Sequence, residues 1–134
     1  MTRETTVSDR RLSLAAWLLV VTQLVHGVTP AHTGEHTIVG PAVGLVLLAT
    51  SIVAIVGFRS ARSWARPLFG WTGVVVVVGF VLYHALPISS LATNPYYGKS
   101  VPVAAWISVG LTIAAGLWAS TLSFRANGHR WGDE

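Results

Sequence analysis

Four long apolar stretches, separated by short polar connections, dominate the pattern of this chain. They run over residues 12–28, 37–58, 68–86 and 101–122, and none of them contains Asp, Glu, Lys or Arg. A helix needs roughly 20 predominantly apolar residues to cross the hydrocarbon of a bilayer. The pattern therefore predicts an all-α fold, a bundle of four transmembrane helices, in a single integral membrane domain over residues 1–134.

The details inside the stretches agree with helices rather than strands. Residues 74–78 are all valine, which in water is typical of a strand. In lipid a lone strand leaves its backbone groups unpaired, so a helix is the expected structure. Pro41 and Pro102 fall in the first turns of the second and fourth spans, where the missing N–H costs little.

The composition supports a membrane protein and excludes two other classes. Hydrophobic residues make up 52% of the chain and charged residues only 10%, whereas a soluble domain carries about 25% charged residues. A soluble domain could not cover its surface with so few charges, and a disordered chain would be far less apolar. The absence of cysteine excludes disulfides, thiolate metal sites and a cysteine nucleophile.

The basic residues predict how the chain is oriented. All eight arginines fall on one side of the four spans, and Lys99 is the only base on the other side. Because cytoplasmic loops carry the excess of Lys and Arg, we expect a multi-pass protein of the inner (plasma) membrane with both termini in the cytoplasm. The net charge of +4 then indicates contact with anionic lipid in the bilayer rather than nucleic-acid binding. An aromatic belt is expected at the two interfaces, formed by Trp64, Trp71 and Trp118 inside and by Tyr96, Tyr97 and Trp106 outside.

The two halves of the chain share a layout that suggests a duplication. The first span ends in His26 followed by Pro30, and the third ends in His84 followed by Pro87. Each is followed by a polar outer loop and then by a span with proline in its first turn. We therefore consider two tandem in-out-in hairpins related by an axis along the membrane normal. The alternative is that prolines and polar residues simply collect at helix ends.

Polar residues inside the spans predict which helix faces meet. Thr22, Gln23 and His26 share one face of the first span, and Ser108 shares a face with Thr112 on the fourth. His84 shares a face with Phe80, Val77 and Gly73 on the third span. Polar groups in hydrocarbon turn toward the bundle interior, so we expect these three faces to meet. Small-residue pairs that let helices approach are expected at Gly40 with Gly44 and at Gly110 with Ala114.

The outer side gathers the residues with the most chemistry, namely His26, His32, Glu35, His36 and His84. Imidazole with a carboxylate suits zinc or copper, so these five residues form a candidate metal site. Two histidines from different helices can also hold haem b, for which His26 and His84 are the candidate ligands. Two alternatives stay open: solvated or hydrogen-bonded structural histidines, and histidines that sense pH or handle protons.

No catalytic set stands out, so an enzyme is not expected. Residues 32–36 match H-x-x-E-H, a metalloprotease pattern, but Gly34 interrupts the helix that it needs and no third ligand follows on that side. In its bias toward Val, Ala, Gly and Arg the chain resembles small four-span membrane proteins of high-GC bacteria, and no activity is implied by that resemblance.

Three functions are compatible with the sequence. The first is a non-enzymatic accessory subunit, associating with other membrane subunits or with its own copies, or a small-ligand binder with a histidine-rich site at the outer face. The second is a haem- or metal-binding (Cu/Zn) redox-type membrane protein. The third is a small transporter or channel subunit that uses the polar stripe of Thr22, Gln23 and Ser108.

Overall fold

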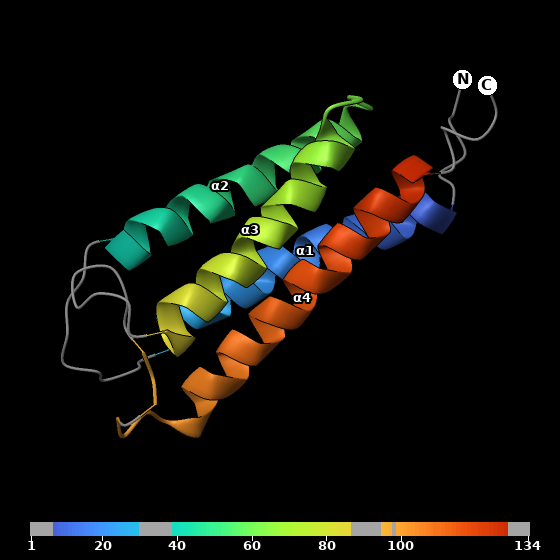
Figure 1. Ribbon diagram of the computed structural model, residues 1–134. Helices are drawn as coiled ribbons and strands as arrows, with labels where there is room; N and C mark the ends of the chain where they lie inside the picture. The colour runs from blue at the N-terminus through green and yellow to red at the C-terminus, as the bar shows by residue number, and fades with distance from the viewer. Residues whose placement is uncertain (1–6, 30–38, 87–94, 98, 129–134) are drawn as a thin grey trace.

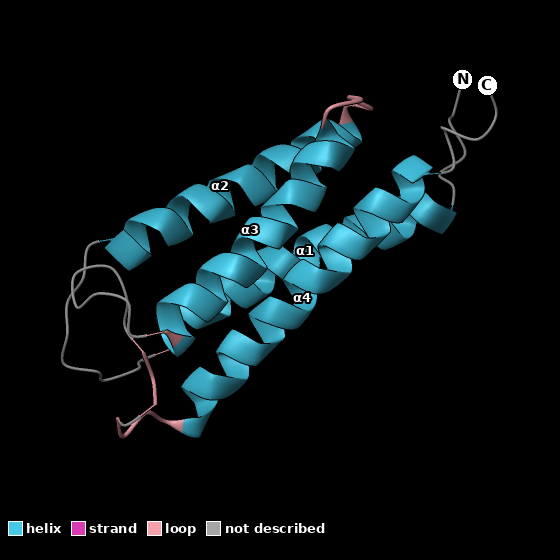
Figure 2. Ribbon diagram, viewed as in Figure 1, coloured by secondary structure: helices cyan, strands magenta, loops and turns pink. Residues whose placement is uncertain are grey.

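The fold consists of four α-helices joined by short connections (Figures 1 and 2). The computed structural model describes residues 7–29, 39–86, 95–97 and 99–128. The helices are α1 (Val7–Val28), α2 (Val39–Arg59), α3 (Ala65–Ala85) and α4 (Val103–Gly128). The described residues contain no strand, and the valine run of α3 is helical, as predicted.

Each helix is long and apolar enough to cross a bilayer. The qualifying segments are Arg10–Val28, Val39–Arg59, Ala65–Ala85 and Val103–Arg125. They coincide with the four predicted spans to within three residues at each end, which is the usual uncertainty of a helix boundary. The fold class is therefore confirmed, and the chain has the architecture of a multi-pass membrane protein. The two-hairpin duplication stays a prediction.

The helices follow one another around the bundle, with α4 returning to pack against α1 (Figure 1). As a result α1 and α3 lie diagonally opposite each other, as do α2 and α4. The bundle has two chemically different ends. One end, where α1 begins and α4 ends, is called the arginine end and carries Arg10, Arg11, Arg59, Arg62, Arg66 and Arg125. The other, where α1 and α3 end, is called the histidine end and carries His26 and His84.

A tight turn at the arginine end connects α2 to α3. The N–H of Arg62 donates to the carbonyl of Gly57 (2.9 Å), and the N–H of Ala61 donates to the carbonyl of Phe58 (3.1 Å). These bonds satisfy carbonyls left over at the end of α2. Ala61 has a φ of 52°, a left-handed conformation that usually requires glycine. The short turn fixes α2 and α3 as antiparallel neighbours.

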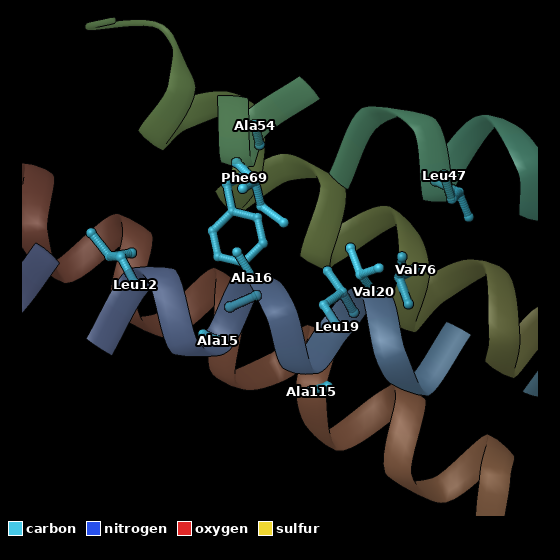
Figure 3. Close-up of a cluster of buried hydrophobic side chains, with 12 residues drawn as sticks. Leu12, Ala15, Ala16, Leu19, Val20, Leu47, Ala54, Phe69, Val76 and Ala115 are labelled. Atoms are coloured by element: carbon cyan, nitrogen blue, oxygen red, sulfur yellow. The ribbon is translucent and has the colours of Figure 1, made fainter. Parts of the chain in front are cut away.

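The arginine half and the middle of the bundle share a closely packed, largely apolar core. Leu19, Phe69 and Val76 are fully buried there, together with several alanines (Figure 3). A Cβ at Gly73 would lie 2.6 Å from the carbonyl oxygen of Gly116, so the backbones of α3 and α4 touch at this point. Small residues at such crossings maximise van der Waals contact in lipid, where the hydrophobic effect does not drive helices together.

The predicted small-residue contacts are only partly right. A Cβ at Gly40 would collide with the ring of Tyr83, so α2 and α3 do approach there. Neither Gly44 nor Gly110 has any neighbouring atom within 4 Å of an added Cβ, so the prediction for these two was wrong. Gly110 is exposed on the surface of α4, whereas Gly44 is partly buried on the same face as Leu47 without a close neighbour.

The outer surface of the bundle is apolar, as lipid contact requires. Leu45 and Val46 on α2 and Val103 and Ile107 on α4 each expose more than half of their surface. A groove of about 370 Å³ between α1 and α4 is lined mainly by apolar side chains, among them Trp118. In water this surface would promote aggregation, whereas in a bilayer it is the expected contact with acyl chains.

Candidate histidine site

Two histidines from diagonally opposite helices meet at the histidine end. His26 lies two residues before the end of α1, and His84 lies one residue before the end of α3. Their ring centroids are 5.0 Å apart, and the ring planes are inclined at 76°. His84 is buried with 5% of its surface exposed, and His26 is half-buried. The structure therefore brings together the two residues predicted as the core of the outer site.

The helical period explains why both rings point inward. Leu19 is fully buried on α1, and Thr22 and His26 follow it at intervals of three and four residues. Phe80 precedes His84 by four residues on α3, and its ring centroid lies 4.8 Å from that of His26. Residues spaced in this way share one helix face. The predicted meeting of the α1 and α3 faces is thus confirmed.

Ser108 of α4 fixes the orientation of His26. Its Oγ lies 3.0 Å from Nδ1 of His26, and its hydroxyl donates to the carbonyl of Ala105 at 2.7 Å. Because the short contact to Ala105 uses the single proton of the hydroxyl, we assign Nδ1–H of His26 as the donor to Ser108. In the neutral imidazole this leaves the lone pair on Nε2, which is then the ring nitrogen available to a ligand.

Aromatic rings enclose His84 on its remaining sides. Its ring centroid lies 4.3 Å from that of Tyr96, 4.8 Å from that of Tyr83 and 5.6 Å from that of Phe80. The N–H of Tyr96 donates to the carbonyl of His84 at 3.0 Å, which ties the connection before α4 to the end of α3. The ring of Trp106 on α4 packs edge-on against the ring of Tyr96, with the two centroids 5.3 Å apart.

Tyr83 and Tyr96 are residues of this site that the sequence did not reveal, and Tyr96 departs most from its expected place. It was predicted to belong to the aromatic belt, but only 3% of its surface is exposed, and the prediction was wrong. Its neighbour Tyr97 is 51% exposed and fits the belt, as do Trp64, Trp71 and Trp106. Burial raises the pKa of the Tyr96 hydroxyl, and the nearby Tyr83 raises it further. Tyr96 therefore covers His84 as a neutral phenol at neutral pH.

Further polar contacts lie next to the histidine pair, on the side toward the arginine end. The side-chain amide of Gln23 on α1 donates to Oγ of Ser51 on α2 at 3.1 Å. The hydroxyl of Thr112 on α4 lies 3.2 Å from the carbonyl of Thr22 on α1. The predicted meeting of the α1 and α4 faces is therefore confirmed as well.

The other predicted metal ligands, His32, Glu35 and His36, lie outside the described residues. The H-x-x-E-H pattern that they form lies there too. Within the part of the chain that the structure describes, no group of three or more His, Asp or Glu side chains suited to a metal ion occurs. The described site is thus a pair of imidazoles with a hydroxyl on one side and aromatic rings around the other.

This arrangement is suited to binding. It offers a fixed imidazole lone pair on His26, a second imidazole in contact with it, and a surrounding that excludes water from His84. A nucleophile needs a base within hydrogen-bond reach, and that base needs a third group to orient it. Ser108 is close to His26, but its proton goes to a backbone carbonyl, so it is not set up as a nucleophile.

Similarity to known proteins does not identify the site. No protein-family model matches the chain, no curated protein matches it, and no solved structure matches it. The four-span fold and the His26–His84 pair are thus the two features from which a function is inferred.

Proposed function

We propose that this chain is a small, non-enzymatic membrane protein that binds a small ligand at its histidine end through His26 and His84. The observation that supports this most directly is the contact of the two rings, 5.0 Å apart, at the ends of diagonal helices. A polar group in the hydrocarbon region is costly, and those that occur there are commonly functional. Two imidazoles that face each other in the bundle interior fit that pattern.

The core below the pair supports a one-sided site rather than a pathway. The polar stripe of Thr22, Gln23 and Ser108 belongs to the histidine half and the middle of the bundle. Toward the arginine end Leu19 and Phe69 are fully buried, and the buried polar side chains described there are the isolated hydroxyls of Thr72, Ser120 and Ser123. A transporter or channel formed by one copy would need a continuous polar or water-filled path through this region, which isolated hydroxyls among apolar side chains do not provide. We therefore favour binding over transport.

A metal or haem site is the second candidate. The spacing of the two imidazole rings distinguishes a single metal ion from a haem. Haem between two histidines would place its macrocycle between the rings. Here the rings contact each other, and Phe80 packs at 4.8 Å against His26. This geometry favours a single ion over a haem. His32, Glu35 and His36 follow α1 directly in the sequence and are proposed as additional ligands.

We also propose that the histidine end faces the outside of an inner membrane of a bacterial cell and that both termini are cytoplasmic. The six described arginines at one end support this orientation through the positive-inside rule. Fluorescent-protein and alkaline-phosphatase fusions at the C-terminus provide the test. Fluorescence without phosphatase activity is expected, and the reverse result would invert the orientation.

Ligand binding can be tested on protein purified in mild detergent from cells supplied with haem, copper and zinc. We expect native mass spectrometry, an optical spectrum and metal analysis to reveal a bound species. The species should be lost in His26→Ala and His84→Ala and retained in His129→Ala, which removes a histidine far along the chain. If no species is lost with the pair, the binding role is wrong. Turnover of a substrate by the purified chain alone would contradict the non-enzymatic role.

A further inference from the structure

We infer that the ligand of the histidine pair is a divalent transition-metal ion of the zinc and copper class, bound by Nε2 of His26 and a ring nitrogen of His84, with Ser108 as a positioning residue. This inference rests on the proposed function, since it names the ligand of the same site. Three observations lead to it: the ring spacing, the hydrogen bond to Ser108, and the aromatic surroundings of His84.

The ring spacing is compatible with a shared ion. Two imidazoles that bind one tetrahedral ion through metal–nitrogen bonds of about 2.0–2.1 Å have their centroids about 5 Å apart. The observed distance between the centroids of His26 and His84 is 5.0 Å. The rings are inclined at 76°, so they are not stacked face to face, an arrangement that would direct their nitrogens away from a common point.

The bond to Ser108 prepares His26 as a ligand. Metal-binding histidines almost always donate their second ring N–H to an oxygen, which fixes the tautomer and the ring orientation. Ser108 accepts from Nδ1–H because its own proton goes to Ala105. His26 therefore presents Nε2 with its lone pair before any ion arrives. The 3% exposure of Ser108 keeps water from competing for this bond.

The surroundings of the pair favour a cation over other ligands. The rings of Phe80, Tyr83 and Tyr96 lie around His84 at centroid distances of 4.3–5.6 Å. These rings shield His84 from water, so an ion bound there would be held by imidazole nitrogens without competition from bulk solvent. Imidazole nitrogens suit zinc, copper, iron and nickel, and the chain has no cysteine that would select a softer ion. Both histidines lie within two residues of a helix end, so an ion need not enter the middle of the membrane.

The test uses full-length protein in detergent or nanodiscs, purified without a polyhistidine tag, and titrated separately with Zn²⁺ and Cu²⁺. One ion per chain should bind, and X-ray absorption should show at least two imidazole nitrogens at about 2.0–2.1 Å. Binding should be lost in His26→Gln and in His84→Gln, two changes that keep a polar side chain in place. The melting temperature of each variant, measured without metal, shows whether it still folds.

Ser108 is tested with a matched pair. Ser108→Ala should weaken metal binding about 10–100-fold, and Ser108→Thr, which keeps the hydroxyl, should restore it. In metal-free protein, ¹⁵N chemical shifts should show His26 protonated on Nδ1 in the natural chain and in Ser108→Thr. The Ser108→Ala variant should lose that preference. An unchanged tautomer in Ser108→Ala would remove the positioning role.

The remaining outcomes separate this inference from the proposed function. If the protein binds neither Zn²⁺ nor Cu²⁺, while an organic species still copurifies and disappears with the histidine variants, the metal inference fails and the binding function stands. If neither metal nor any other species depends on the pair, both fail. If metal binding persists without His26 and His84 but disappears in His32→Ala/His36→Ala, the ion belongs elsewhere and the inference is overturned.

Discussion

The two halves of the bundle hold their helices together in different ways. In the arginine half, backbones touch at Gly73 and Gly116, and the polar side chains Thr72 and Ser120 donate to backbone carbonyls. In the histidine half and the middle, side chains bond to each other across helices. His26 pairs there with Ser108, and Gln23 pairs with Ser51.

This difference in packing bears on the proposed function of the histidine end. Hydrogen bonds between side chains of membrane helices contribute only about 0.6 kcal/mol on average, so they are an inefficient way to hold helices together. Close backbone contact at small residues already serves that purpose in the arginine half. Under the proposed function the imidazole pair binds a ligand, whereas the buried ring of Tyr96 both covers His84 and contributes to stability.

The largest effect is expected from the aromatic cover of the site. Tyr96→Ala should destabilise the bundle by about 3 kcal/mol, because it removes a buried ring that contacts His84 and Trp106. It should also make His84 reactive toward diethylpyrocarbonate, followed by peptide mass spectrometry. Tyr97→Ala is the matched control, since that ring is 51% exposed and its loss should change stability by less than about 0.5 kcal/mol. If Tyr96→Ala and Tyr97→Ala change stability and His84 reactivity equally, Tyr96 does not cover His84.

The glycine contact of the arginine half should give the next largest effect. Gly73→Ala should cost about 2 kcal/mol, because the new Cβ would lie 2.6 Å from the carbonyl of Gly116 and force α3 and α4 apart. Gly110→Ala has no atom within 4 Å of its Cβ and should be neutral or slightly stabilising. Unfolding of both variants in mixed micelles provides the measurement. A destabilised Gly110→Ala would instead point to contact with a second chain.

Part of this comparison could be predicted from sequence. The four spans follow from uninterrupted apolar runs, and the shared depth of His26 and His84 follows from their positions near helix ends. The contact between Gly73 and Gly116 could not be predicted from sequence. The chain offers several small-residue pairs of similar spacing, and the rotation of each helix about its axis decides which of them makes contact. Gly110 and Ala114 have the same spacing as Gly116 and Ser120. Only the latter pair faces α3.

The two histidines of the site could be predicted from sequence. The aromatic residue that covers His84 could not. An aromatic residue in an outer loop is ordinarily an interfacial anchor, and sequence gives no sign that Tyr96 instead folds back over His84. Its burial follows from the backbone bond to the His84 carbonyl, which depends on the path of the connection. The pairing of Ser108 with His26 likewise needs the relative rotation of α1 and α4, which periodicity leaves open.

The smallest effect concerns the bond between α1 and α2. Gln23→Leu and Ser51→Ala each remove one partner of a 3.1 Å bond, and a double-mutant cycle isolates their coupling. We expect about 0.6 kcal/mol, the average for such bonds in membranes. Metal or ligand binding should be unchanged in both variants. A coupling several times larger would show that side-chain bonds carry much of the stability and would weaken the comparison of the two halves.

The most direct test of the site is whether His26 and His84 are neighbours in the membrane. The natural chain has no cysteine, so His26→Cys/His84→Cys introduces the only two thiols. A short bifunctional thiol reagent should join them within one chain in native membranes, as seen by peptide mass spectrometry. The pair His26→Cys/Ala85→Cys, whose second position is exposed, should react far less. Equal yields for the two pairs, or cross-links only between separate chains, would contradict a shared site.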